Sequence, residues 1–164
     1  MKKLDKVDQA ILRALQRDGT LSQGQLAERV GASPASCWRR VRALEEAGVL
    51  GPVVRLVRPE TLGLTVNVLC HIRLKNHLPE TSATFEAFLS SATSIIECFA
   101  MSGDWDYLLR IVAPDIASYE RFLRGEILAN SAVATASSTF ALSTLKQTTE
   151  LPIDPFWLRH VNND

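Results

Sequence analysis

The chain has 164 residues, equal numbers of acidic and basic side chains, and a globular composition with 46% hydrophobic residues. This length suits one domain or two small ones, and the composition excludes disordered and collagen-like chains. The apolar runs are too short to cross a bilayer, and the start lacks the apolar core of a signal peptide. We therefore expect a cytoplasmic protein with no membrane partner. Three cysteines without a CxxC pair favour neither a disulfide framework nor a zinc site.

The charges are distributed unevenly along the chain. Residues 1–60 contain eleven Lys and Arg against seven Asp and Glu, a net charge of +4, so the remainder carries −4. A basic N-terminal third suggests that this part meets a polyanion, although a chance scatter of surface charge explains the count equally well.

Residues 1–52 are expected to form three short helices. The first runs from about Asp5 to Arg17, with an apolar residue every third or fourth position. The second begins with a capping box, Ser22 and Gln25, and ends at Gly31.

The third helix follows after a two-residue gap. Ser33 is a good N-cap, and Pro34 occupies the first helical position, where its missing amide hydrogen costs nothing. Cys37, Val41 and Leu44 form its apolar stripe. Two short helices joined by a tight glycine turn are typical of a helix-turn-helix.

A helix-turn-helix presents its second helix to the major groove of double-stranded DNA, which is the partner we expect. Arg40 lies nearer the buried side, so it either bridges helices or reaches a phosphate, and Trp38 is equally well explained as a packing residue. An ordinary three-helix bundle with a solvated arginine face is the alternative. The candidate DNA-binding residues are Ser22, Gln23, Ser33, Pro34, Ala35, Ser36, Trp38, Arg39, Arg40 and Arg42.

Beyond residue 52 the pattern changes to strands and helices. Residues 53–62 form a linker that includes a short extended ribbon over 53–58, the wing of a winged helix-turn-helix. Strands are then expected over 65–75, 95–102, 105–112 and 133–146, with helices over 79–92 and from Pro114 to about Ile127. The order β-α-β-β-α-β predicts an α+β chain whose second domain, residues 63–150, is ferredoxin-like. Residues 151–164 are expected to form a tail that packs on another surface and is not part of the sheet.

Both faces of the expected sheet are partly apolar, while two helices cover one face only. We group Cys98 with Leu108 on one face, and Phe99 with Leu109 on the other. The face left uncovered favours a second copy of the chain, and hence a homodimer.

No catalytic motif stands out, and His71, His77 and His160 do not have metal-ligand spacing. We expect no enzyme activity, no cofactor and no metal. The hairpin from Ser102 to Tyr107 concentrates amides, carboxylates and aromatic rings, which suits the ammonium and carboxylate groups of a free amino acid. An ordinary hairpin with capping aspartates is an equally good interpretation.

These motifs together resemble the Lrp/AsnC (feast/famine) family of transcription regulators over nearly the whole chain. The resemblance is carried by four segments: Leu4-Asp5 to Leu15, Leu26 to Pro34, Arg40 to Leu50, and Ser102 to Leu109. Val133 and Lys146 also match the last strand.

The resemblance implies an effector-binding (RAM) domain, dimers that assemble into tetramers or octamers, and amino-acid effectors bound between dimers. The family often has Thr-x-Thr or Thr-x-Ser on its last strand, whereas this chain has Ala136-Ser137-Ser138. The implied effector-binding residues are Ser102, Gly103, Asp104, Trp105, Asp106, Tyr107 and Ser138.

We therefore expect a sequence-specific regulator modulated by an amino acid or a related metabolite. The alternatives are an architectural DNA-organising protein with little ligand response, and an enzyme or sensor whose N-terminal helices merely pack. RNA binding through the sheet is less favoured, because that domain is acidic.

Overall fold

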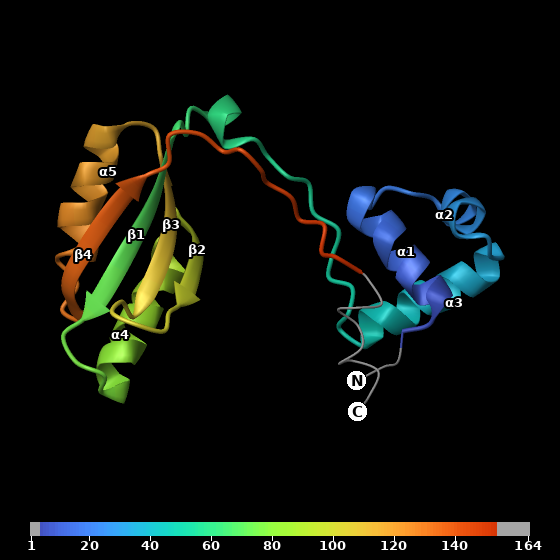
Figure 1. The fold of residues 1–164 in the computed structure, drawn as a ribbon, viewed down its shortest axis with the longest axis horizontal. Coiled ribbons are helices and arrows are strands. Elements are labelled where there is room, and N and C mark those ends of the chain that lie inside the picture. The colour runs from blue at the N-terminus through green and yellow to red at the C-terminus, as the bar shows by residue number, and fades with distance from the viewer. Residues whose placement is uncertain (1–3, 154–164) are drawn as a thin grey trace. The chain divides into compact units, whose positions relative to one another are not determined.

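The computed structural model describes residues 4–153 (Figure 1). Contacts divide the chain into two compact units, one extending to Arg55 and joined by the chain from Lys146 onward, the other running from Leu56 to Leu145. The sequence-based boundaries placed residues 146–150 in the second domain. The difference arises because the chain returns to the helical unit after its last strand.

The helical unit contains, within the described residues, α1 (Lys6–Arg17), α2 (Gln23–Val30) and α3 (Pro34–Glu46). The predicted caps are confirmed: Asp5 and Ser22 each form a capping box, and the Ser33 hydroxyl accepts from an amide in the first turn of α3. The core is built from the predicted apolar stripes, including fully buried Ile11, Leu26, Cys37 and Leu44.

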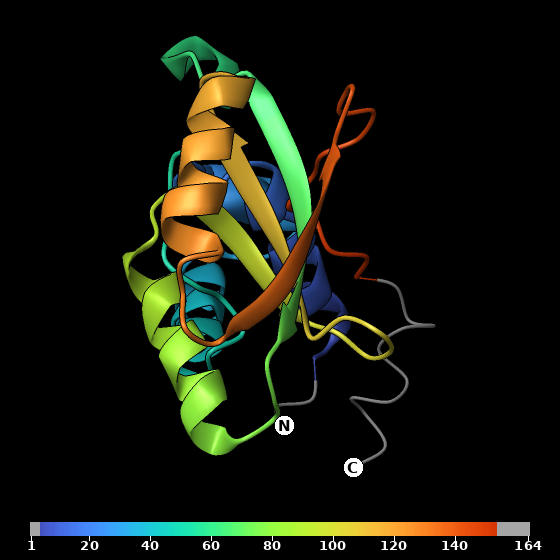
Figure 2. The same cartoon turned by 90° about the vertical axis from the view of Figure 1, so that its left-hand side faces the viewer.

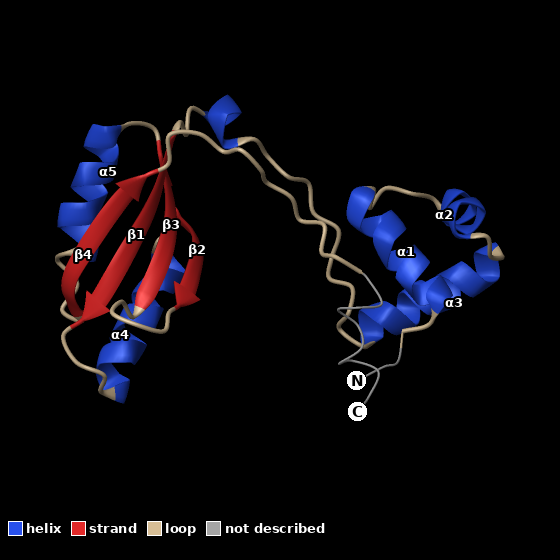
Figure 3. Cartoon of the chain, viewed as in Figure 1, coloured by secondary structure: helices blue, strands red, loops and turns tan. Residues whose placement is uncertain are grey.

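The expected ribbon over residues 53–58 is not a strand. This segment has no regular secondary structure, and its apolar side chains are largely exposed, with Leu56 at 75%. The three valines of this segment favour a strand, but a strand forms only where a neighbour completes its hydrogen bonds, and no described segment pairs with this one. It joins α3 to a short 3-10 turn, η1 (Pro59–Leu62), and appears as loop in Figure 3.

The second unit has the predicted β-α-β-β-α-β order. Its elements are β1 (Val66–Leu74), α4 (Pro79–Ser91), β2 (Ile95–Ala100), β3 (Tyr107–Ala113), α5 (Ile116–Phe122), which continues into a π-helical turn, η2 (Leu123–Ile127), and β4 (Val133–Phe140). The strands are antiparallel and lie in the order β2-β3-β1-β4. This is the ferredoxin-like arrangement.

Three strand ends differ from expectation by two residues or more. β4 stops at Phe140 instead of continuing to Lys146, because its partner β1 begins at Val66 and the last link is from the Ala141 amide to the Asn67 carbonyl. The strands of the hairpin are also shorter, ending at Ala100 and resuming at Tyr107.

Helices α4 and α5 cover the same face of the sheet (Figure 2). The core between them is formed by Val68, Cys70 and Ile72 of β1, Leu109 and Ile111 of β3, and Phe85, Tyr119 and Ile127 of the helical segments. The opposite face carries the alternate residues of each strand, and we call it the open face.

The expected grouping across the hairpin was wrong by one residue. Cys98 lies opposite Leu109, and Phe99 lies opposite Leu108, with a bulge between Ile95 and Glu97. Phe99 and Leu108 therefore belong to the open face, while Cys98 packs against the core. A bulge adds a residue to one strand only, so alternation alone does not fix the pairing beyond it.

Candidate DNA-binding face and ligand-binding hairpin

The outward side of α3 is available for a groove of DNA. Ala35, Trp38, Arg39 and Arg42 are exposed. Trp38 has 56% of its surface accessible, so it packs little against the described residues. Arg39 forms no bond with another described residue, whereas Arg42 makes a weak contact of 3.4 Å with Glu45 one turn later.

The other predicted DNA-binding residues lie at helix starts. Ser22, Gln23, Ser33 and Pro34 are exposed, and Ser36 is half-buried. The Ser22 hydroxyl accepts from the Gln25 amide at 3.3 Å. Since the first amides of a helix lack intrahelical acceptors, the exposed start of α2 suits a phosphate oxygen.

Arg40 has the structural role that we gave as one of its two alternatives. One nitrogen of its guanidinium lies 2.7 Å from Asp5 and 2.7 Å from Asp8, so it joins α3 to the start of α1. The Asp8 side chain is 3% exposed and needs a positive partner. Arg40 is thus held by contacts within the domain, whereas its neighbour Arg39 is exposed.

The ionisation of this cluster follows from its contacts. The Asp8 amide, and then the Arg40 guanidinium, hold the pKa of the Asp5 carboxyl below its usual value. Hydrogen bonds to Asp8 and Asp5 raise the pKa of Arg40. Asp5 and Arg40 are therefore both charged throughout the neutral pH range.

The hairpin between β2 and β3 is fixed to β1. The Asp106 carboxylate accepts from the Leu74 amide at 2.7 Å, and the Asp106 amide donates to the Ile72 carbonyl at 2.9 Å. Gly103 has a φ of 104°. A residue with a side chain would be strained in this backbone conformation, so the bend requires glycine. Residues 102–104, at the tip of the loop, are exposed.

A basic and aromatic group lies beside the hairpin. The Arg73 guanidinium lies 5.1 Å from the centre of the Trp105 ring and donates to the Asp104 carbonyl at 2.9 Å. His71 lies 5.6 Å from the same ring. His71 and Arg73 are on the open face of β1, and sequence reasoning missed Arg73 because its place opposite the hairpin depends on register.

The two aspartates of the hairpin have different environments. Asp104 is exposed and its carboxylate binds no described residue, whereas Asp106 is half-buried and already accepts a backbone hydrogen bond. The Asp104 carboxylate therefore has no described partner, whereas Asp106 fixes the loop to β1.

Tyr107 and Ser138 are not brought to the exposed part of the hairpin. Tyr107 packs against Phe85 of α4 with ring centres 4.8 Å apart and the rings tilted by 40°. Burial raises the pKa of its phenol. Ser138 shares a hydrogen bond with Tyr119 and lies beside Cys70 on the helix-covered face. Within one chain, the hairpin and Ser138 do not form one site.

No helix within residues 4–153 is long and apolar enough to cross a membrane. The same residues contain no group of three His, Cys, Asp or Glu side chains that could hold a metal ion.

A helix-turn-helix with an exposed recognition helix, followed by a ferredoxin-like domain with an open hairpin, defines a DNA-binding protein with a ligand-binding domain. The comparisons agree. Residues 4–50 match the winged helix-turn-helix DNA-binding model, and residues 67–151 match the Lrp/AsnC ligand binding domain. The chain belongs to the Lrp/AsnC family of DNA-binding transcriptional regulators.

Similar proteins match almost from end to end. The transcriptional regulator AzlB of Bacillus subtilis is 35% identical over 151 residues, covering 92% of this chain and 96% of its own. Among solved structures, a Neisseria meningitidis transcriptional regulator in complex with L-Met has a TM-score of 0.89 and 33% identity, covering 97% and 99%. An AsnC family regulator of Agrobacterium tumefaciens has a TM-score of 0.86 and 42% identity, covering 91% and 97%.

Proposed function

We propose that this regulator recognises specific DNA sequences as a homodimer and that a free amino acid, bound at the hairpin of residues 102–106, modulates its DNA affinity or its assembly. The observation that carries the ligand is the hairpin itself. It combines the backbone of the exposed residues 102–104, the carboxylate of Asp104, and the guanidinium of Arg73 in one small region. The similar Neisseria regulator was solved with L-Met, which supports the same class of ligand.

The chemistry of the two ends of an amino acid fits this arrangement. Asp104 suits the ammonium group, while the amides and Arg73 suit the carboxylate. Arg73 is oriented by the Trp105 ring and by the Asp104 carbonyl, so little freedom remains to be lost on binding. The hairpin of one chain is a surface loop, and we infer that a neighbouring copy completes the enclosure.

The homodimer is supported by the open face of the sheet. Leu69 and Phe99 are 37% and 51% exposed there, and helices cover only the other face. An apolar sheet face of this kind is stabilised by burial against a partner. A two-fold dimer also presents two recognition helices to two half-sites of DNA.

A thermal-shift screen against the twenty amino acids tests the ligand. A ligand at 100 times its dissociation constant adds about 2.7 kcal/mol to native stability, so the amino acid that binds gives a clear upward shift. Screening with the amide and the decarboxylated amine of that amino acid then tests both charged ends. If no amino acid shifts the transition of a DNA-binding sample, the ligand assignment is wrong.

Binding to a pool of genomic fragments tests sequence specificity. We expect retention of a small set of fragments at low protein concentration. Uniform coating of all fragments, with no amino-acid response, is instead the behaviour of an architectural DNA-organising protein.

A further inference from the structure

The chain returns to the helix-turn-helix unit after the ligand-binding domain. Residues 150–153, which we call the strap, lie on α1. The Leu151 amide donates to the Gln16 side-chain oxygen at 2.7 Å, and the Gln16 side-chain nitrogen donates to the Leu151 carbonyl at 3.2 Å. One side-chain amide thus satisfies both backbone groups of Leu151, as a neighbouring strand would.

Contacts on either side of Gln16 extend this attachment. The Arg13 guanidinium donates to the Ile153 carbonyl through its Nε at 3.0 Å and through a terminal nitrogen. Arg17 lies 2.8 Å from the Glu150 carboxylate, but this pair is exposed and contributes little. The Ile153 side chain packs against the core of the helical unit. The strap is therefore held chiefly by Gln16, Arg13 and the burial of Ile153.

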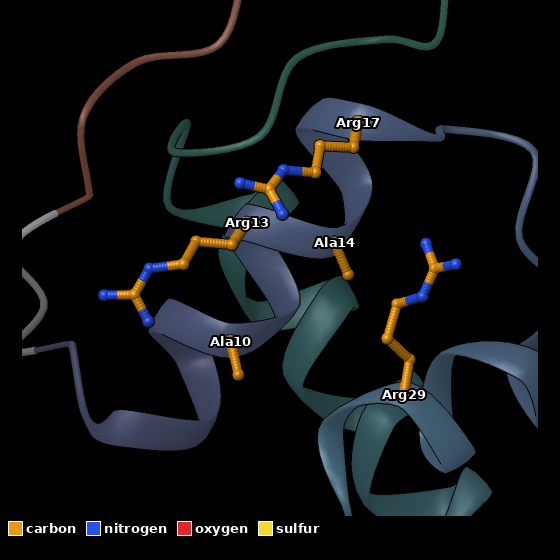
Figure 4. Close-up of a pocket in the computed structure, with 5 residues that line it drawn as sticks. All are labelled: Ala10, Arg13, Ala14, Arg17 and Arg29. Carbon is orange, nitrogen blue, oxygen red and sulfur yellow. The ribbon is translucent and has the colours of Figure 1, made fainter.

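Two arginines that bind the strap, Arg13 and Arg17, also line a basic groove. Arg13 and Arg17 of α1 and Arg29 of α2 line a groove of about 500 Å³ whose other lining residues are Ala10 and Ala14 (Figure 4). Guanidinium groups that line one groove repel one another, and nearby acceptor oxygens offset this repulsion. The strap supplies such oxygens to two of the three, the Ile153 carbonyl and the Glu150 carboxylate.

Because the strap belongs to the helical unit, two segments of the chain connect the two units. The chain passes between them twice, after Arg55 and after Leu145. Residues 141–149 join the end of β4 to the strap, and such a segment spans at most about 30 Å when fully extended. A domain attached through two segments samples fewer orientations than a domain on one linker.

We propose that the strap is a second tether, which limits the orientations of the helix-turn-helix domain and thereby raises the affinity of the dimer for DNA with two half-sites. When one domain of the dimer is bound, the affinity gained from the second depends on its effective concentration at the neighbouring half-site. Fewer accessible orientations raise that concentration if they include the productive one. The inference rests on the homodimer of the proposed function.

The test compares two neutral double variants of the full chain. Gln16→Ala/Ile153→Ala removes the amide that binds Leu151 and the apolar anchor of the strap. Gln9→Ala/Leu151→Ala is the matched control, since Gln9 bonds to the Leu4 carbonyl and the Leu151 side chain is 71% exposed. Hydrogen exchange of the Leu151 amide reports release of the strap, and circular dichroism reports folding.

DNA affinity is measured on a fragment selected by the wild-type protein from a random pool, and on the same fragment with one half-site scrambled. We expect the strap variant to expose the Leu151 amide to exchange and to lower the ratio of two-site to one-site affinity about fivefold or more. The control is expected to keep both the protection and the ratio.

Two results overturn the inference. In the first, the Leu151 amide exchanges freely in the wild-type protein. In the second, the strap is released while the ratio stays at the wild-type value. Failure of the homodimer is recognised separately, because a monomeric wild-type protein shows no two-site advantage at all. If Ile153→Ala impairs folding, Gln16→Ala alone against Gln9→Ala provides the same comparison.

Discussion

At the scale of single residues, two neighbouring arginines of α3 have separate tasks. Arg39 is exposed and binds no described residue, while Arg40 neutralises the buried Asp8. We predict that Arg39→Ala weakens DNA binding by about 1–3 kcal/mol if Arg39 reads a base, and leaves stability unchanged within about 0.5 kcal/mol. Arg40→Ala is expected to lower the free energy of unfolding by about 2–3 kcal/mol, because it leaves Asp8 without a countercharge.

Denaturant unfolding and titration of a DNA fragment separate these effects. The double variant Asp8→Asn/Arg40→Met removes both charges and should recover part of the stability lost in Arg40→Ala. If Arg39→Ala binds DNA like the wild type, Arg39 does not contact the groove. If Arg40→Ala is as stable as the wild type, the ion pair with Asp8 is not the support that we infer.

The two aspartates of the hairpin differ as the two arginines do: Asp104 is exposed and unbonded among the described residues, while Asp106 supports the fold. Asp104→Ala should abolish the thermal shift given by the amino acid while leaving the unliganded transition in place, because its carboxylate supports no described part of the fold. Asp106→Ala should destabilise the domain by about 1–3 kcal/mol, since the Leu74 amide loses its acceptor. A ligand response that survives Asp104→Ala would show that the ammonium group binds elsewhere.

At the scale of helices and strands, local chemistry predicted more than long-range pairing did. Asp5, Ser22 and Ser33 cap their helices as expected, because a cap depends on residues two or three positions away. The partner of Phe99 was misassigned because it depends on the bulge near Ile96. Arg73 was missed for the same reason. The tail from Leu151 was expected to pack on another part of the protein, but its partner, α1, is distant in sequence and was not predicted.

The start of α1 gives the helical unit a defined response to acid. Asp5 has a lowered pKa in the folded state, so its contribution to stability is present above the ordinary value of about 4 and is lost as pH falls through the lowered pKa. Asp5→Asn keeps an N-cap residue but loses the charge that faces Arg40. We expect it to be less stable than the wild type by up to about 1 kcal/mol at pH 7.

This deficit should disappear towards low pH. Denaturant unfolding of both proteins between pH 2 and 7 checks the prediction, with Asp104→Asn as a control for an exposed carboxylate that lacks such partners. A deficit that remains constant through pH 2 would mean that the cap geometry was lost, and that the charge of Asp5 was not responsible.

At the scale of the whole molecule, the open face of the sheet decides how copies assemble. The face could be anticipated from alternation on β1 and β3, but its residues on β2 required the structure. Phe99 and Leu69 project from this face, beside polar neighbours such as Arg110 and Glu97, which pair with each other at 3.1 Å. Arg110 lies on the internal strand β3, directly opposite Leu69, so this face combines apolar side chains with an ion pair.

Replacing Phe99 tests whether this face joins two copies. Phe99→Asp places a charge where the partner's apolar surface would lie, and we expect sedimentation velocity to show monomers at concentrations at which the wild type is dimeric. Ile116→Asp is the matched control, because Ile116 is 64% exposed at the start of α5, away from the sheet face. The monomeric variant should keep its affinity for a single half-site and lose the advantage of two, since the recognition helices are unchanged while their connection is broken. If the Phe99→Asp variant remains a dimer, the two copies associate through another surface.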